Sequence, residues 1–105
     1  MTKALPSDWF LRSRLKMRHI LLLAAIDDQR SLHKAAAALH MTQPAATKLL
    51  GDLEATLDLR LFQRTVRGLT PTAHGNSLIR HARLMLGTLD HARAELSAIS
   101  DGAAG

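Results

Sequence analysis

The sequence predicts a mainly α-helical domain in which three helices and one small β-hairpin are followed by a long C-terminal helix. Hydrophobic residues make up 47% of the 105 residues but aromatic residues only 3%, so the core must consist of Leu, Ala, Ile and Met. Ala and Leu favour helices, and residues with high strand propensity are scarce. Several segments repeat apolar residues with the helical period, whereas only the segment around Gly68 alternates as short strands do.

The first two predicted helices are separated by a polar break. Residues 15–28 include an apolar run at 20–26, which indicates a helix that is buried over most of its surface. Ser31 can then cap a short helix over residues 32–39, because its hydroxyl can accept from a free backbone amide. Residues 1–14 show no clear period and form an N-terminal arm, either an ordered extension or a frayed tail, in which Ser7 can cap a short turn.

A tight turn at His40 and Met41 leads into the third helix. Histidine is one of the few non-glycine residues that adopt the left-handed conformation readily. Thr42 is the predicted N-cap, and Pro44 follows in the first turn, where its missing amide costs little. The helix runs to about residue 57. Its predicted buried stripe is Ala46, Leu49, Leu50, Leu53 and Leu57, and its opposite face carries Gln43, Pro44, Thr47, Lys48, Gly51 and Asp52.

The rest of the chain predicts a hairpin and then a long helix. Short strands on either side of Gly68 form the hairpin, Pro71 ends it, and Thr72 caps the last helix. That helix, over residues 73–99, repeats apolar residues with alternating spacings of four and three, which is a heptad seam for pairing with a second chain. The seam is Leu78, Ala82, Met85, Leu89, Ala92, Leu96 and Ile99.

These elements divide the chain into four parts. Residues 15–72 form the helical domain with its hairpin, residues 73–99 the dimerisation helix, and residues 100–105 the start of a flexible linker; residues 1–14 are the arm.

Charge and composition exclude several classes of protein. Fourteen Lys and Arg against nine Asp and Glu give a net charge of +5, which suggests a polyanionic partner without proving one. The absence of cysteine excludes disulfides and thiolate zinc sites and favours a cytoplasmic location. The longest apolar run is too short to span a membrane, and the N-terminal residues do not resemble a signal peptide. We expect neither a cofactor nor a membrane partner.

Two short helices joined by a three-residue turn predict a helix-turn-helix whose second helix lies in the major groove of double-stranded DNA. Gln43 can pair with adenine through its amide, Thr47 can contact a base or phosphate, and Lys48 can contact a phosphate or guanine. Arg64 and Arg67 would place guanidinium groups beside the backbone or in the minor groove. The candidate DNA-contacting residues, helix caps included, are Ser31, Thr42, Gln43, Pro44, Thr47, Lys48, Arg64 and Arg67.

Several separated motifs resemble the N-terminal region of LysR-type transcriptional regulators. They are SLHKAAAALHMTQPAATK at 31–48, LE at 53–54, LFQR at 61–64 and LTPTAHG at 69–75. The resemblance covers about residues 15–99 and implies a winged helix-turn-helix, a linker helix that pairs two subunits antiparallel, and a C-terminal effector-binding domain beyond this sequence, through which a small molecule would act. It also implies DNA contacts at Gln43, Pro44, Thr47 and Lys48, and at Arg64 or Arg67.

Two positions depart from the pattern of that family. Leu49 stands where members often have a polar residue, which removes one candidate base reader. Gly51 stands where members often have a basic residue, which removes a phosphate contact and weakens the helix by up to about 1 kcal/mol relative to alanine. We therefore expect an operator preference that differs from the usual one of the family.

Simpler interpretations remain open from the sequence. The polar face could be ordinary helix surface, Arg64 could pair with Glu54 as structural support, and the heptad seam could pack on its own domain. The chain could also be a helical interaction module with incidental basic charge. The sequence contains no nucleophile–base pattern of the kind that would indicate an enzyme. The spacing of the six histidines does not favour a metal site.

Overall fold

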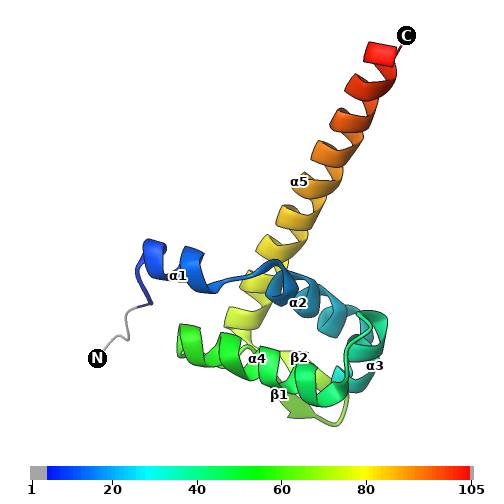
Figure 1. Cartoon of the computed structure of the whole chain (residues 1–105). Helices are drawn as coiled ribbons and strands as arrows, with labels where there is room; N and C mark the ends of the chain where they lie inside the picture. Colours follow the sequence, from blue (N-terminus) through cyan, green and yellow to red (C-terminus); the bar gives the residue numbers. More distant parts are fainter. Residues whose placement is uncertain (1–4, 105) are drawn as a thin grey trace.

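Three helices form the core of the protein, which a computed structural model describes for residues 5–104, with side chains to residue 102. They are α2 (Met17–Gln29), α3 (Leu32–Ala38) and α4 (Gln43–Leu57). α2 packs against both α3 and α4, and α3 packs against α4. In Figure 1, α4 lies below α2, and α3 is at the right-hand end of both. This is the predicted helix-turn-helix with its supporting helix.

The predicted helix caps are confirmed. The Ser31 hydroxyl accepts from the Lys34 amide at 3.2 Å, and the Thr42 hydroxyl accepts from the Ala45 amide at 3.2 Å. His40 has a left-handed backbone with φ of 57°, as the turn between α3 and α4 requires. The backbone between the two helices is thus fixed by local chemistry, and it sets the direction in which α4 leaves α3.

The core is aliphatic. The buried stripe predicted for α4 is confirmed at Ala46, Leu50, Leu53 and Leu57, whereas Leu49 is half-buried at the edge. The alanines of α3 divide in two: Ala35 and Ala36 are buried, and the next two are exposed. The largest fully buried side chains are Leu22, Leu23, Ile26, Leu53 and Leu61. Burial of such side chains is the main stabilising contribution in a domain of this size.

The hairpin consists of β1 (Phe62–Thr65) and β2 (Gly68–Pro71), which pair antiparallel with Phe62 opposite Pro71. Gly68 has φ of 99°, a conformation that favours glycine. A Cβ atom at this position would lie 2.5 Å from the carbonyl oxygen of Arg30, and the neighbouring Leu69 amide donates to that same oxygen at 3.1 Å. Gly68 therefore lets the hairpin dock on the residue that ends α2.

The last helix, α5 (Ala73–Ala104), begins under the Thr72 cap, where the Thr72 hydroxyl accepts from the Gly75 amide at 3.1 Å. It packs against α2 and then continues away from the body (Figure 1), so the molecule measures 57 × 32 × 21 Å. The predicted flexible linker over residues 100–105 is wrong within the described residues, because the helix continues to Ala104. A single Gly102 costs only about 1 kcal/mol relative to alanine, and two alanines follow it.

The N-terminal arm contains a further helix, α1 (Asp8–Arg14), which the sequence did not predict. The Ser7 hydroxyl caps it by accepting from the Phe10 amide at 3.2 Å. Leu11 packs against the core, and α1 contacts α4. The arm is therefore an ordered extension over these residues, while residues 1–4 of the predicted arm lie outside the described residues.

Candidate nucleic-acid interface

The face of α4 opposite the core is exposed and largely polar. Gln43, Pro44, Thr47 and Lys48 all lie on it, as predicted, and the Thr42 cap beside them is exposed too. Because the buried stripe fixes how the helix is rotated, these side chains point away from the domain together. A helix presented in this way can enter a groove about 12 Å wide, the width of the DNA major groove.

Lys48 is held by an acidic neighbour one helical turn away. Its Nζ donates to Oδ2 of Asp52 at 2.9 Å, and both side chains are exposed. The ammonium is therefore oriented along α4, and its charge is largely balanced in the free protein. Contact with a phosphate or a guanine would require Lys48 to exchange this carboxylate for the new partner.

A shallow depression of about 270 Å³ lies between the start of α3, the start of α4 and the hairpin. Ser31, Gln43 and Arg64 line it, so the structure brings together three of the predicted contact residues. Arg30 and His33 line it as well, and sequence reasoning missed both. Their positions beside the Ser31 cap could have suggested them, because residues around a helix N-terminus share its surroundings.

The hairpin carries its two predicted arginines on an exposed surface. Arg64 is in β1, and Arg67 is in the turn next to Val66, whose side chain is fully exposed. The alternative pairing of Arg64 with Glu54 is not seen within residues 5–104; instead, Oε2 of Glu54 accepts from the Leu61 amide at 2.7 Å. Glu54 thus ties the end of α4 to the entry of β1, and Arg64 stays available on the surface.

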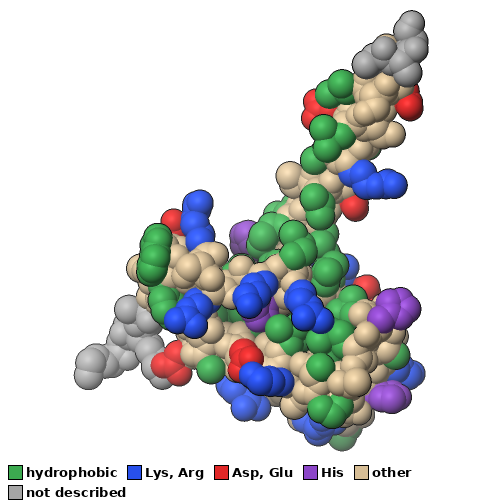
Figure 2. Space-filling view, in the orientation of Figure 1, with side chains coloured by type: hydrophobic (Ala, Val, Ile, Leu, Met, Phe, Trp, Pro, Cys, Tyr) green, Lys and Arg blue, Asp and Glu red, His purple; other side chains and the backbone are tan. Residues whose placement is uncertain are grey.

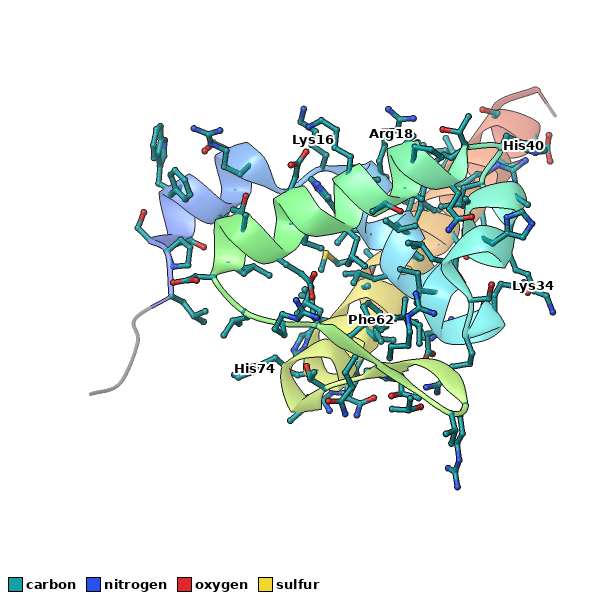
Figure 3. All side chains as sticks on the ribbon, turned by 90° about the horizontal axis from the view of Figure 1, so that it is seen from below. Lys16, Arg18, Lys34, His40, Phe62 and His74 are labelled. Carbon is teal, nitrogen blue, oxygen red and sulfur yellow. The ribbon has the colours of Figure 1, made fainter. Side chains whose placement is uncertain are left out.

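A second basic flank lies on the other side of α4 from the hairpin, and sequence reasoning missed it. Arg14, Lys16 and Arg18 are exposed where α1 joins α2. Figure 3 shows Lys16 and Arg18 beyond α4, with the hairpin on its opposite side, and Figure 2 shows a row of Lys and Arg side chains across this part of the surface. A signal was present in the sequence, because residues 12–18 contain four cations and no acid.

His19 supports the junction beneath this basic flank. Its side chain is buried, and Nδ1 accepts from the Lys16 amide at 2.9 Å. Burial lowers the pKa of His19, and the nearby charge of Lys16 lowers it further. The neutral imidazole is therefore the form that caps α2 and holds the α1–α2 connection in place.

The predicted dimerisation seam divides at the edge of the domain. Ala82 is fully buried in the core of its own chain and Leu78 is half-buried, so this end of the seam packs inward. Ile79, which the heptad pattern did not include, is buried as well. The distal residues stay exposed: Met85 at 40%, Leu89 at 52%, Leu96 at 66%, Ile99 at 61%, and Ala92. The apolar stripe available to a second chain is this distal part.

Other kinds of site find no support in the part of the chain that the structure describes. Among those residues, no three His, Cys, Asp or Glu side chains gather as metal ligands would. No helix within residues 5–104 has both the length and the apolar character needed to cross a membrane.

Comparison with known proteins gives consistent results. Residues 17–76 match the family profile described as bacterial regulatory helix-turn-helix protein, lysR family. The HTH-type transcriptional regulator GbpR of Azospirillum brasilense is 51% identical over 100 residues, which cover 95% of this chain and 29% of that protein. GbpR of Rhizobium radiobacter is 38% identical over 91 residues, covering 85% of this chain and 30% of that protein. The chain thus spans less than a third of the length of these relatives.

Solved structures match over most of this chain. The BenM DNA-binding domain, crystallised with catB site 1 DNA, has a TM-score of 0.77 and 26% identity, covering 84% of this chain and 95% of that one. The CbnR DNA-binding domain, in complex with DNA, has a TM-score of 0.72 and 28% identity, covering 82% of this chain and 99% of that one. The chain therefore has the fold of these DNA-binding domains.

Proposed function

Because the chain belongs to the lysR family of bacterial regulatory helix-turn-helix proteins, we propose that it binds a specific sequence of double-stranded DNA as the N-terminal part of a longer transcription regulator. The observation that carries this proposal is the exposed polar face of α4, held outward by a fully apolar buried face. Helices presented in this way read base edges in the major groove.

Within that groove, the residues at the start of α4 are the proposed base readers. Gln43 lies in the first turn, where its amide can donate to and accept from adenine, and Thr47 follows one turn later. Pro44, Thr42 and Ser31 frame this end of the helix and lie close to the phosphate backbone. Lys48 contacts a phosphate or guanine after it releases Asp52.

The hairpin is the proposed wing, and it positions the protein on the duplex. Arg64 lines the depression beside the start of α4, and Arg67 is exposed in the hairpin turn; a phosphate backbone or the adjacent minor groove would lie against them. Contacts to phosphates set register and orientation without reading sequence. The docking of Gly68 and Leu69 on Arg30 keeps this wing at a fixed distance from α3 and α4.

A second copy of the chain is the proposed partner through α5. The apolar stripe Met85, Leu89, Ala92, Leu96 and Ile99 is exposed in one chain, and an antiparallel pair of such helices would cover both stripes. Two-fold symmetry then calls for two inverted half-sites in the operator. A small-molecule effector would act through the part of the regulator that this chain does not span, and the whole protein would work in the bacterial cytoplasm.

The alternative is a helical interaction module whose basic charge is incidental. An interaction face would carry apolar anchors at its centre. The exposed row of α4 has Gln43, Pro44 and Thr47 there instead, and the amide and the hydroxyl among them favour a polar ligand.

Selection of binding sites from random duplexes, followed by gel shifts against competitor DNA at several salt concentrations, tests the proposal. We expect an enriched inverted repeat and an affinity that falls steeply with salt, by about 0.9 in slope of log affinity for each phosphate contact. Equal affinity for all duplexes, or a slope near zero, would contradict sequence-specific DNA binding.

A further inference from the structure

We infer that α1 and its junction with α2 form a second clamp on the DNA backbone, which holds the strand on the side of α4 opposite the hairpin. The inference rests on the proposed function, which supplies the duplex, and extends it to Arg14 and Lys16, which precede the family match at 17–76. Its basis is the charge of the α1–α2 junction and the position of that junction beside α4.

The cations of this flank are not neutralised by the protein. Within residues 5–104, Arg14, Lys16 and Arg18 form no ion pair, whereas Arg12 is paired with Asp8 at 2.9 Å. Three exposed cations on one short stretch create a local positive potential that attracts an anion. The two hairpin arginines lie on the other side of α4, so the exposed face of α4 has positive charge on both sides.

The position of the basic flank beside α4 fits a DNA major groove, which is bounded by two phosphate backbones. An α-helix with its side chains is about 10–12 Å in diameter, which nearly fills a major groove about 12 Å wide. A phosphate backbone must therefore run along each side of α4. The hairpin would meet one backbone. Figure 3 shows Lys16 and Arg18 on the opposite side of α4, where they would meet the other.

An open cleft of about 570 Å³ separates this flank from α4. Arg14 and Lys16 line it from one side and Asp52 from the other. The carboxylate of Asp52 would repel a phosphate, but Arg14 and Lys16 set two positive charges against this one negative charge. The net charge around the cleft therefore stays positive, which favours a phosphate there.

The flank is also held in place before any ligand binds. The Arg14 guanidinium lies over the Phe10 ring, 5.1 Å from its centroid, and the buried His19 side chain caps the amide of Lys16. Ordered donors bind an anion with less loss of conformational freedom than a mobile tail would. This order distinguishes the junction from a disordered basic arm.

The test compares two double variants that each remove two positive charges. Arg14→Gln with Lys16→Gln should flatten the salt dependence of operator binding by about 1.8 in slope, or about 0.9 for each lost phosphate contact, and should leave the base preference unchanged. Arg80→Gln with Arg93→Gln removes the same charge from α5 and should change the slope much less. Hydroxyl-radical footprints of the wild type and of the first variant should differ by the loss of protected sugars on one strand beside each half-site.

A charge-preserving swap controls for folding. Arg14→Lys with Lys16→Arg should keep the wild-type slope, and thermal melts should show that all the variants are folded. If the first double variant matches the α5 control in both slope and footprint, the second clamp does not exist. If the wild type itself binds no duplex specifically, the proposed function fails instead, so the two failures are distinguishable.

Discussion

Arg83 of α5 holds the long helix against α2 through Asp27: its Nη2 donates to Oδ2 of Asp27 at 2.7 Å, and also to Oδ1 of Asp28 at 2.7 Å. Asp27 in turn pairs with Arg30 at 3.2 Å, and the Arg30 carbonyl receives the hairpin amide of Leu69. A continuous polar chain therefore runs from α5 through the end of α2 to the hairpin.

Arg83→Ala should destabilise the domain by about 1 kcal/mol, because the ion pairs are partly exposed and solvent screens them. Urea unfolding measures the change. Arg80→Ala is the control, since Arg80 is exposed on the same helix and forms no ion pair within residues 5–104. Equal losses of stability in the two variants would show that the contact between Arg83 and Asp27 contributes nothing.

Gln43→Ala and Arg67→Ala should weaken DNA binding in different ways. Loss of the Gln43 amide should cost about 1–3 kcal/mol at one base position and relax the preference there. Loss of Arg67 should weaken all sequences alike and flatten the salt slope by about one. Binding-site selection and salt titration of both variants separate the effects. A uniform loss in both cases would mean that Gln43 does not read a base.

The sequence could predict those features of the fold that depend on a residue and its near neighbours along the chain. The caps at Ser31 and Thr42, the left-handed His40 and the start of α5 at Thr72 were predictable, because each depends on the residue type and its near neighbours. The exposed face of α4 followed from its apolar period. The helix-turn-helix pattern and the family resemblance both implied contact roles for those side chains.

Features set by packing between distant elements were not predictable. The helix α1 is short and has no period of its own, and it is ordered by packing Leu11 on the core. The heptad pattern could not tell which part of α5 packs inward, so Ala82 was assigned to the seam and Ile79 was omitted. The Lys48–Asp52 pair was also missed, although its spacing of four on a helix is a recognisable signal.

Asp52→Asn should strengthen DNA binding, because Lys48 then reaches a phosphate or guanine without first giving up its carboxylate partner. Asp90→Asn, on the exposed part of α5, makes the same change in net charge away from α4. Filter binding across a salt series measures both. If Asp52→Asn and Asp90→Asn behave alike, Lys48 does not contact the backbone.

The stability of the domain should decrease as the pH falls below about 6.5, the ordinary pKa of histidine. Burial lowers the pKa of His19 in the folded chain, so the unfolded chain binds the proton more readily, and folding loses free energy as the pH drops through this window. Protonation would also remove the acceptor of the Lys16 amide. His19→Gln keeps an acceptor oxygen but cannot titrate.

Urea unfolding between about pH 7.5 and about pH 5 tests this expectation. The wild type should lose more stability over the range than His19→Gln, whereas His91→Gln, on the exposed part of α5, should behave as the wild type does. An equal loss in all three proteins would assign the pH dependence to other groups.

The distal part of α5 should pair with a second chain. The helix has 32 residues, which is about 48 Å at 1.5 Å per residue, and the domain covers only its first turns. The uncovered apolar stripe is centred on Leu89, and burying it is worth about 25 cal/mol per Å² before the costs of association. Leu89→Glu would place a charge at the centre of the seam, and Ala94→Glu would place one on the opposite face of the helix.

Sedimentation and operator binding together decide whether α5 is the dimer interface. Leu89→Glu should sediment as a monomer and lose far more affinity for the full inverted repeat than for one half-site, because only a dimer engages both half-sites at once. Ala94→Glu should remain dimeric and bind the repeat as the wild type does. A wild type that sediments as a monomer, yet binds the repeat much more tightly than a half-site, would show instead that DNA alone brings the two subunits together.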